Sequence, residues 1–368
     1  MLKVGILGVK GYTGEELIKI LLRHSQVKIS YLTARLNKPA PIAEIFPQFK
    51  GRLDLWCENL DLSQAVQSAD LFFLALPHTS SMDVVPTLLR GGKKVIDLSA
   101  DYRLDDYRLY EAWYKVKHKD KANIKKAVYG LSEINNSKIK KAGFIANPGC
   151  YPTAAILALA PLLKEKFSPR EIIIDAKSGY SGAGRRPADD PFWAELKDNF
   201  KAYKVDAHQH TPEIEQELSK LAKKKIKVTF VPHLLPIERG ILETIYVKVS
   251  HQPCLAGRQA SAISHQLTNA YKKYYKDKPL VRIKNEGEFP CLRDVQGTSF
   301  CDIGVKVSAD QKTIIIISAI DNLLKGASGQ AVQNMNLMCG FEETEGLLRN
   351  PPLNKGGHRR WRGKRGEV

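Results

Sequence analysis

Short apolar runs alternate with helical patterns over residues 1–100. Continuous apolar residues predict β-strands at 3–7, 27–32, 71–76 and 94–98. Between the first two strands, apolar side chains at helical spacing predict a helix over 14–24. Continuous apolar strands are typical of a parallel sheet that is covered on both faces. The pattern therefore predicts an α/β domain with a doubly wound parallel sheet and right-handed crossovers.

A second group of strand-like runs lies further along the chain, at 171–175, 227–231, 241–249 and 313–318. These runs predict a mixed sheet with helices on one face. The polar, lysine-rich residues 103–143 are interpreted as a connection between the two domains. Residues Ala319 to Leu337 predict a late helix that packs back on the first domain. A chain of 368 residues is long enough for two such domains.

The composition is that of a globular protein, with 43% apolar and 26% charged residues. There are 57 Lys and Arg against 39 Asp and Glu, and the resulting charge of +18 is compatible with nucleic acid, an anionic membrane surface or small acidic ligands. The six cysteines form no CxxC pair, which disfavours a disulfide framework and a zinc site. Since no apolar run approaches the ~18 residues of a membrane span and no signal-peptide pattern is seen, we expect a cytoplasmic protein without a membrane partner.

A glycine-rich turn, Gly8-Val-Lys-Gly11-Tyr-Thr-Gly14, lies between the first predicted strand and the first predicted helix. Glycines allow a tight turn there, so that a pyrophosphate can approach the free amides at the helix N-terminus. An ordinary βα turn is the alternative. The position directly after the first strand favours nucleotide binding.

The second predicted strand leads into Thr33-Ala34-Arg35. In folds that prefer NAD, an Asp or Glu at this position binds the ribose hydroxyls, whereas a hydroxyl and a cation suit a 2′-phosphate. The sequence therefore predicts NADP(H) as the cofactor, with a solvated loop charge as the alternative role of Arg35.

Cys150 lies in Asn147-Pro-Gly-Cys-Tyr-Pro-Thr-Ala-Ala155, directly before a helical pattern over 156–163. Pro and Gly end the preceding strand, so the cysteine opens a helix, where unpaired amides and the helix dipole favour thiolate over thiol. This position predicts a catalytic nucleophile. The alternative, a small buried apolar side chain, suits the other five cysteines better.

Two histidines, His208 and His210, precede Glu213 at the start of another helical pattern. Such a group could supply a general base and a residue that orients it. It could also be half of a metal site or a surface pair, but no further His, Cys or Asp cluster completes a ligand set. We therefore predict a general base and no metal.

Two further segments, 99–103 and 177–185, combine Lys or Arg with small, flexible residues. Backbone amides beside a cation suit the recognition of a carboxylate or a phosphate. Either segment could instead be a basic surface loop. The candidate substrate-binding residues are Arg103, Ser178, Arg185 and Glu213.

These motifs, taken in chain order, resemble one known family. The most specific are Asn147-Pro-Gly-Cys-Tyr-Pro-Thr153 and His208-Gln-His-Thr-Pro-Glu-Ile214. They are accompanied by Ala75-Leu-Pro-His78, Asp97-Leu-Ser-Ala-Asp-Tyr-Arg103, Asp175-Ala-Lys-Ser-Gly179, Arg239-Gly-Ile241 and Asp321-Asn-Leu-Leu-Lys-Gly-Ala327. Together they are similar to N-acetyl-gamma-glutamyl-phosphate reductases of arginine biosynthesis.

The resemblance implies NADPH-dependent reduction of N-acetyl-L-glutamyl 5-phosphate to the 5-semialdehyde, with release of inorganic phosphate. By position it implies that Cys150 forms a thioester and that His208 is the acid/base, with His210 as the reserve candidate. The implied cofactor contacts are Gly8, Lys10, Gly11, Tyr12, Thr13, Gly14, Thr33, Ala34, Arg35 and Asn322. Lys10 and Ala34 stand where the family usually has Ser.

The resemblance also implies an architecture and an assembly. A Rossmann-type NADP-binding domain would occupy 1–146, joined by a late helix at 322–347, and an α+β catalytic and oligomerisation domain with a mixed sheet would occupy 147–321. Residues 350–368 have no counterpart in the family, and their own composition predicts a basic, disordered tail. We expect a homodimer or homotetramer that acts on a small-molecule substrate.

Two alternatives stay open. The nearest is the lysine-branch reductase, whose aminoadipyl substrate is linked to a carrier protein. A nucleic-acid-binding protein that uses the basic tail is less favoured, because Cys150 and the two histidines would then have no role.

Overall fold

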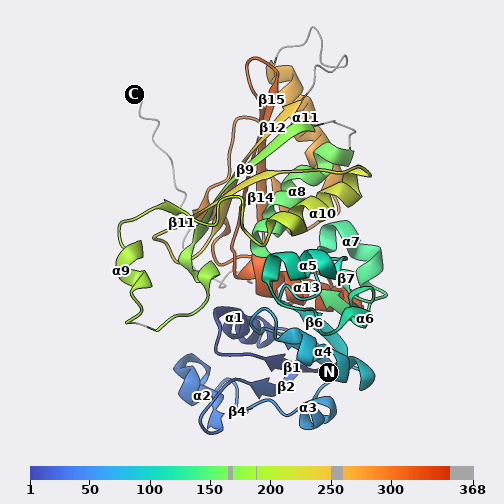
Figure 1. Ribbon diagram of the computed structural model, residues 1–368, viewed down its shortest axis with the longest axis vertical. Coiled ribbons are helices and arrows are strands. Elements are labelled where there is room, and N and C mark those ends of the chain that lie inside the picture. Colours follow the sequence, from blue (N-terminus) through green and yellow to red (C-terminus); the bar gives the residue numbers. More distant parts are fainter. Residues whose placement is uncertain (165–168, 188, 250–259, 349–368) are drawn as a thin grey trace, which may run out of the picture.

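The computed structural model describes residues 1–164, 169–187, 189–249 and 260–348. The described residues form two β-sheets that lie at opposite ends of the long axis of the molecule (Figure 1). The basic segment 350–368, for which the sequence predicted a disordered tail, lies outside the described residues.

The first sheet is built from short, largely apolar strands in the order β3-β4-β2-β1-β5-β6-β8-β7. All neighbouring strands of this sheet run parallel except β3 and β4 at one edge. The strands are β1 (Leu2–Leu7), β2 (Val27–Thr33), β3 (Ala40–Pro41), β4 (Trp56–Glu58), β5 (Leu71–Leu74), β6 (Lys94–Asp97), β7 (Val128–Tyr129) and β8 (Phe144–Ala146).

Helices cover both faces of the first sheet, as the continuous apolar strands predicted. Alternate side chains of β5 show this: Leu71 and Phe73 belong to one apolar cluster, whereas Phe72 and Leu74 belong to another. The first cluster includes α1 and the second includes α3 and α4. The helices of this part are α1 (Tyr12–Leu21), α2 (Ile42–Ile45), α3 (Leu62–Ser68), α4 (Val85–Arg90), α5 (Tyr107–Tyr114), α6 (Lys121–Ile124) and α7 (Ser132–Ile139).

The interpretation of residues 103–143 as a connection is wrong. This segment contains α5, α6 and α7, and its strand β7 extends the first sheet beyond β8. The segment is anchored by a few buried side chains, among them Tyr110, Tyr129 and Ile139. Because these short helices bury so few apolar residues, the lysine-rich exposed positions dominate the sequence pattern.

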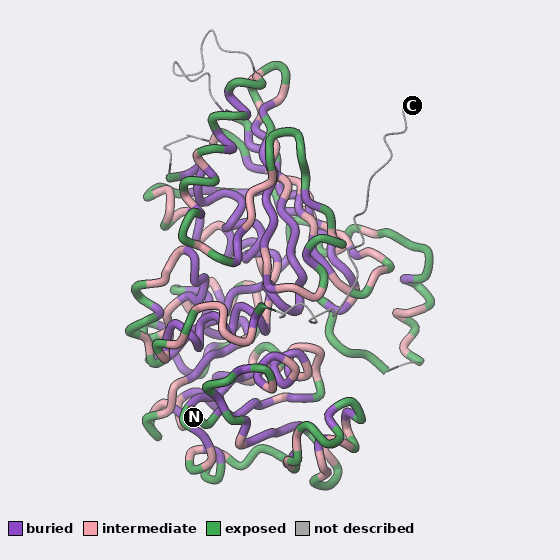
Figure 2. The backbone as a smooth tube through the Cα atoms, turned by 180° about the vertical axis from the view of Figure 1, so that it is seen from behind, coloured by how far each residue is buried: buried purple, intermediate pink, exposed green. Residues whose placement is uncertain are grey.

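The second sheet is mixed and has the order β10-β11-β9-β12-β15-β14-β13. Figure 2 shows that the central strands of this sheet are largely buried. The strands are β9 (Pro169–Gly179), β10 (Lys201–Ala202), β11 (Thr229–Leu235), β12 (Ile241–Val249), β13 (Val281–Ile283), β14 (Cys301–Val307) and β15 (Thr313–Ile320). Three long helices, α8 (Cys150–Lys164), α10 (Thr211–Ala222) and α11 (Ala260–Tyr274), lie along one face of this sheet (Figure 1), and two short helices, α9 (Phe192–Leu196) and α12 (Leu292–Val295), complete this part.

Helix α8 is the central support of the second part. Its residues 151–163 are all buried, and Ala, Leu and Ile occur on every side of it. A helix that is apolar all round must be covered all round. The strands β12, β14 and β15 and the helices α10 and α11 supply this cover, so the first residue of α8, Cys150, is held in a rigid environment.

The late helix is shorter than predicted. Strand β15 continues to Ile320, a π-helical turn follows at Leu324–Ser328, and only then does α13 (Gly329–Cys339) begin. Helix α13 contacts α1, α7 and β6, so the chain does return to the first part, as the sequence predicted. Residues 340–347 follow as turns.

Candidate active site

The carboxyl ends of β1, β2, β5, β6 and β8 open on one cavity of about 1010 Å³. The same cavity is also lined from the second part of the chain, by residues 181–185 and by Asn322, Leu323, Gly326 and Ala327. The crevice beyond the carboxyl ends of the strands is where doubly wound sheets bind their ligands. The cavity therefore lies between the two parts, at the position that the fold favours for a site.

The glycine-rich turn forms one end of this cavity. Gly8 has φ +97°, and a Cβ on it would lie 2.3 Å from the carbonyl oxygen of Ala75. A Cβ on Gly14 would lie 2.5 Å from the carbonyl oxygen of Gly8. Beside Gly11 the nearest atom would be 3.9 Å away, so the space next to the N-terminus of α1 is open. The turn thus fits a pyrophosphate, which the first amides of α1 would bind.

The residues after β2 form the next part of the wall. Thr33, Ala34 and Arg35 line the cavity, together with Asn59 and Leu60 beyond β4. None of these five side chains is a carboxylate. The wall at this point therefore lacks the acid that would bind a free ribose 2′-hydroxyl and repel a 2′-phosphate.

Cys150 lies on the cavity wall at the first residue of α8. Its Cβ is packed so closely that a Cβ on Gly326, in the π-helical turn, would lie 2.8 Å from it. Burial raises the pKa of the thiol to about 11, against the opposing effects of the Tyr151 amide and the Arg103 guanidinium. The sequence predicted a thiolate here, whereas burial favours the protonated thiol, so a nucleophilic role for Cys150 would require a base.

His210, rather than His208, is the histidine on the cavity wall. Its Nε2 lies 2.5 Å from the position that a Cβ on Gly149 would occupy, next to Cys150. Burial, with repulsion from His208, lowers the pKa of His210 well below its ordinary value, so its imidazole is neutral and can accept a proton. The geometry therefore favours the reserve candidate as the group that exchanges protons with Cys150.

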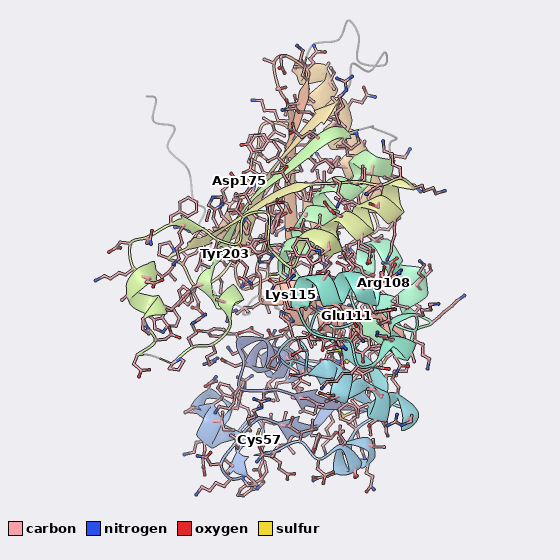
Figure 3. The ribbon with its side chains drawn as sticks, in the orientation of Figure 1. Cys57, Arg108, Glu111, Lys115, Asp175 and Tyr203 are labelled. Atoms are coloured by element: carbon pink, nitrogen blue, oxygen red, sulfur yellow. The ribbon has the colours of Figure 1, made fainter. Side chains whose placement is uncertain are left out.

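His208 is buried behind its neighbour. Its Nδ1 accepts a hydrogen bond from the His210 amide at 3.1 Å, and its Nε2 lies 3.5 Å from the hydroxyl of Tyr203. The Tyr203 hydroxyl in turn lies 3.2 Å from that of Tyr151, the residue after Cys150. Figure 3 labels Tyr203, which follows strand β10 in the second part. These contacts make His208 a residue that holds the loop carrying His210.

Glu213 and Arg103 fix the loop that precedes Cys150. The Glu213 carboxylate accepts hydrogen bonds from the Gly149 amide and the Tyr129 hydroxyl, both at 2.8 Å. Arg103 donates to the carbonyls of Asn147 at 2.7 Å and Leu98 at 2.8 Å, and its guanidinium lies 3.5 Å from Glu213. Arg103 lines the cavity, whereas Glu213 does not, so of these two only Arg103 can reach a ligand there.

The other candidates lie at different places. Ser178 is buried off the cavity, with its hydroxyl on the Gly179 carbonyl at 2.9 Å. Arg185 lines the cavity, lies 4.4 Å above the Tyr12 ring and pairs with Glu15 of α1. Asn322 also lines it and bridges the Gly240 amide and the Ser181 hydroxyl. Among the candidate substrate-binding residues, the cavity thus brings together Arg103 and Arg185 but not Ser178 or Glu213.

Within the described residues, no three or more His, Cys, Asp or Glu side chains are arranged to hold a metal ion. None of the helices described is long and apolar enough to cross a membrane.

Comparison with known proteins assigns both parts of the chain. A model of the semialdehyde dehydrogenase NAD binding domain matches residues 3–142, and a model of the semialdehyde dehydrogenase dimerisation domain matches residues 150–322. The N-acetyl-gamma-glutamyl-phosphate reductase of Geotalea daltonii is 50% identical over 94% of this chain and 98% of its own length. That of Pelotomaculum thermopropionicum is 47% identical over 94% of this chain and 97% of its own length.

The chain belongs to the N-acetyl-gamma-glutamyl-phosphate reductase family. The resemblance seen in the sequence is thereby confirmed. Solved structures show that the fold of this family member is that of the semialdehyde dehydrogenases. Aspartate semialdehyde dehydrogenase II from Vibrio cholerae has a TM-score of 0.68 at 18% identity and covers 92% of this chain and 99% of its own. Aspartate semialdehyde dehydrogenase from Candida albicans, solved with NADP, has a TM-score of 0.67 at 15% identity and covers 92% of this chain and 98% of its own.

Three residues of the site, His78, Tyr203 and Gly326, received no role from the sequence. Gly326 and His78 each lie in a motif that carried the family resemblance, but a motif does not say what its residues touch. Tyr203 lies in no such motif, and its contact with His208 follows only from the folded loop. Gly326 packs on Cys150, and His78 lines the cavity after β5.

Proposed function

We propose that this protein is a cytoplasmic N-acetyl-gamma-glutamyl-phosphate reductase of L-arginine biosynthesis. It would reduce N-acetyl-L-glutamyl 5-phosphate to N-acetyl-L-glutamate 5-semialdehyde with NADPH and release inorganic phosphate. The observation that carries this proposal is that Cys150 and His210 share one cavity with the glycine-rich turn. Relatives that are 47% and 50% identical are N-acetyl-gamma-glutamyl-phosphate reductases, which supports the choice of substrate.

The residues that would hold the cofactor lie along one wall of the cavity. The turn 8–14, with Lys10 at its exposed side, suits the pyrophosphate, and Thr33 to Arg35 suit the 2′-phosphate. Asn322 would add a contact from the second part. NADPH, when bound, supplies the hydride that reduces the acyl carbon.

The first chemical step joins the substrate to Cys150. His210 would accept the thiol proton as the sulfur attacks the acyl phosphate carbonyl, and the amides at the start of α8 would stabilise the oxyanion. The carbon–oxygen bond to phosphate then breaks, phosphate takes the proton from His210, and a thioester remains on Cys150.

The second step releases the aldehyde. Once the thioester carbon is reduced, the tetrahedral alkoxide collapses, the carbon–sulfur bond breaks, and its electron pair stays on the sulfur of Cys150. The thiolate then takes a proton from solvent through His210. Because the imidazole of His210 is neutral before the reaction, the same residue can accept a proton in the first step and deliver one in the second.

The test is an assay of the reverse reaction. The protein would be given N-acetyl-glutamate semialdehyde, inorganic phosphate and NADP, and formation of NADPH would be followed by absorbance. N-acetyl-aminoadipate semialdehyde, free and carrier-linked, and NAD in place of NADP are the comparisons. We expect the highest kcat/KM with the glutamate semialdehyde and NADP. A preference for the carrier-linked substrate would instead identify the lysine-branch reductase.

We further propose that the protein is a homodimer formed through the open face of the second sheet. Helices α8, α10 and α11 cover one face, and the central strands carry apolar side chains on the other, including Leu242, Tyr246, Ile315 and Ile317. Such a face needs a partner. Tyr246→Lys should shift the sedimentation coefficient toward that of a monomer, whereas an unchanged dimer or a tetramer would point to another face.

A further inference from the structure

The turn after β5, Ala75-Leu-Pro-His78, carried part of the family resemblance but has no role in the steps above. Leu76, Pro77, His78 and Ser80 of this segment all line the cavity. His78 is exposed, and its accessible ring is part of the cavity wall. A polar ring at this place is available to a ligand.

Hydrogen bonds to the loop that follows strand β6 fix the position of this turn. The Asp101 carboxylate accepts hydrogen bonds from the amides of Thr79 at 2.7 Å and Ser81 at 3.0 Å, and from the Tyr110 hydroxyl at 2.8 Å. Thr79 has φ +73°, a left-handed conformation that a β-branched residue rarely adopts. The Asp101 carboxylate holds the chain in this conformation, so the position of His78 on the cavity wall is fixed.

The orientation of the His78 ring follows from one hydrogen bond. The Ala100 amide lies 3.1 Å from Nδ1, and since a backbone amide can only donate, Nδ1 is the unprotonated nitrogen. Nε2 therefore carries the proton, and no described residue accepts it. The Tyr114 ring packs edge-on against the imidazole, with centroids 5.8 Å apart, and keeps it from turning.

The hydrogen bond from the Ala100 amide makes His78 a neutral donor, because a protonated imidazole has no nitrogen that can accept. Partial desolvation of the ring, with repulsion from the Arg103 guanidinium, acts in the same direction and lowers the pKa of His78 to about 4. The same guanidinium acts to lower the pKa of Cys150, against the larger effect of burial, and it donates to the carbonyl of Asn147, three residues before Cys150. His78, Arg103 and Cys150 thus act on one end of the cavity, where the first two can offer N–H donors to an anion next to the sulfur.

We propose that the Nε2–H of His78 binds the phosphoryl group of the acyl phosphate, and inorganic phosphate in the reverse reaction, beside Arg103. This inference rests on the proposed function. The phosphoryl group is bonded to the carboxyl group that Cys150 attacks, so it must lie at the end of the cavity that holds Cys150 and Arg103. A neutral donor adds a hydrogen bond without a second positive charge, so phosphate can still leave.

The test measures reverse-reaction kinetics with phosphate as the varied substrate. His78→Ala should raise the KM for phosphate about 10- to 100-fold, the range expected for a lost hydrogen bond to a charged group. The KM values for semialdehyde and NADP should hardly change. His78→Gln, whose side-chain N–H reaches about the position of Nε2, should recover most of the phosphate affinity.

The control is His118→Gln. His118 bonds the carbonyl of Asp101 at 2.7 Å, so it supports the same loop, but it does not line the cavity. Its replacement should leave the KM for phosphate unchanged. An unchanged phosphate KM in His78→Ala, or a rise confined to the semialdehyde or NADP, would overturn the inference while leaving the proposed function intact. A wild-type protein inactive with phosphate would overturn both.

Discussion

At the scale of single residues, Cys150 shows how burial and helix position oppose each other. The N-terminus of α8 favours the thiolate, but enclosure of the sulfur dominates and raises the pKa to about 11. Such a thiol is a weak nucleophile until a base takes its proton. The neutral imidazole of His210, which lies beside Gly149, is able to accept this proton.

The raised pKa of Cys150 can be measured directly. Because only the thiolate reacts with iodoacetamide, alkylation of Cys150 in the free enzyme should accelerate roughly tenfold per pH unit through the neutral and mildly alkaline range. Mass spectrometry of the peptide that contains Cys150 separates it from the exposed Cys291. A rate that levels off below pH 8 would show a stabilised thiolate and contradict the burial argument.

The two histidines can be separated by substitution. His210→Asn should lower kcat by about 10²- to 10⁴-fold, the usual contribution of a general acid/base. His208→Asn should act mainly through the loop, with a smaller loss of kcat and a lower melting temperature, since it removes the contacts with Tyr203 and the His210 amide. The larger kcat loss in His208→Asn would restore the first choice made from the sequence.

The residue pattern narrowed the proposed base to two histidines, and only the family resemblance favoured His208 over His210. The side chains of His208 and His210 point in different directions, and these directions depend on how the loop leads into α10. Only the fold shows that His210 meets the cavity and that His208 contacts Tyr203. The position of Cys150 at the start of a helix was predictable, because Pro148 and Gly149 mark the end of the preceding strand.

At the scale of elements, the π-helical turn Leu324–Ser328 is the feature that the apolar pattern did not reveal. Apolar spacing continued from β15 into α13, so the sequence predicted one helix where a strand end, a turn and a helix follow each other. The turn brings Gly326 against Cys150. A small residue is thus needed at this position for the turn to pack against Cys150.

Gly326→Ala tests this contact. The added Cβ would lie 2.8 Å from the Cβ of Cys150, so the cysteine must move. A displacement of about 1 Å near reacting atoms can lower kcat about 100-fold, and we expect a loss of that order. Gly143→Ala is the matched control, since nothing lies within 4 Å of its Cβ position. Equal kcat values in the two variants would show that the site accommodates a side chain at position 326 without displacing Cys150.

At the scale of the whole molecule, the strand runs predicted two sheets, one covered on both faces and one mixed, and the structure contains both. The order of strands was not predictable, because it depends on pairings between residues far apart in the sequence. The polar segment 103–143 was misread for a different reason: its short helices and strand bury only a few side chains, such as Tyr110, Tyr129 and Ile139, so exposed lysines dominate the sequence pattern.

A buried ion pair joins the two parts behind the active site. Lys325, in the π-helical turn, lies 2.6 Å from Glu133 of α7 and 2.7 Å from the side-chain oxygen of Gln333 in α13. Both charged side chains are fully buried. Although burial acts to raise it, the Lys325 ammonium holds the pKa of Glu133 below its ordinary value, so the carboxylate depends on this partner.

Lys325→Met should therefore lower the free energy of unfolding by about 3–5 kcal/mol, because it leaves a carboxylate buried without its cation. The double variant Lys325→Met, Glu133→Gln removes both charges and should recover most of the loss. Lys119→Met, which breaks an exposed pair with Asp83, should cost no more than ~1 kcal/mol. Urea unfolding followed by fluorescence measures all three. A loss in Lys325→Met as small as that in Lys119→Met would mean that water enters the interface and solvates Glu133, so the two parts would be less tightly joined than their buried contacts indicate.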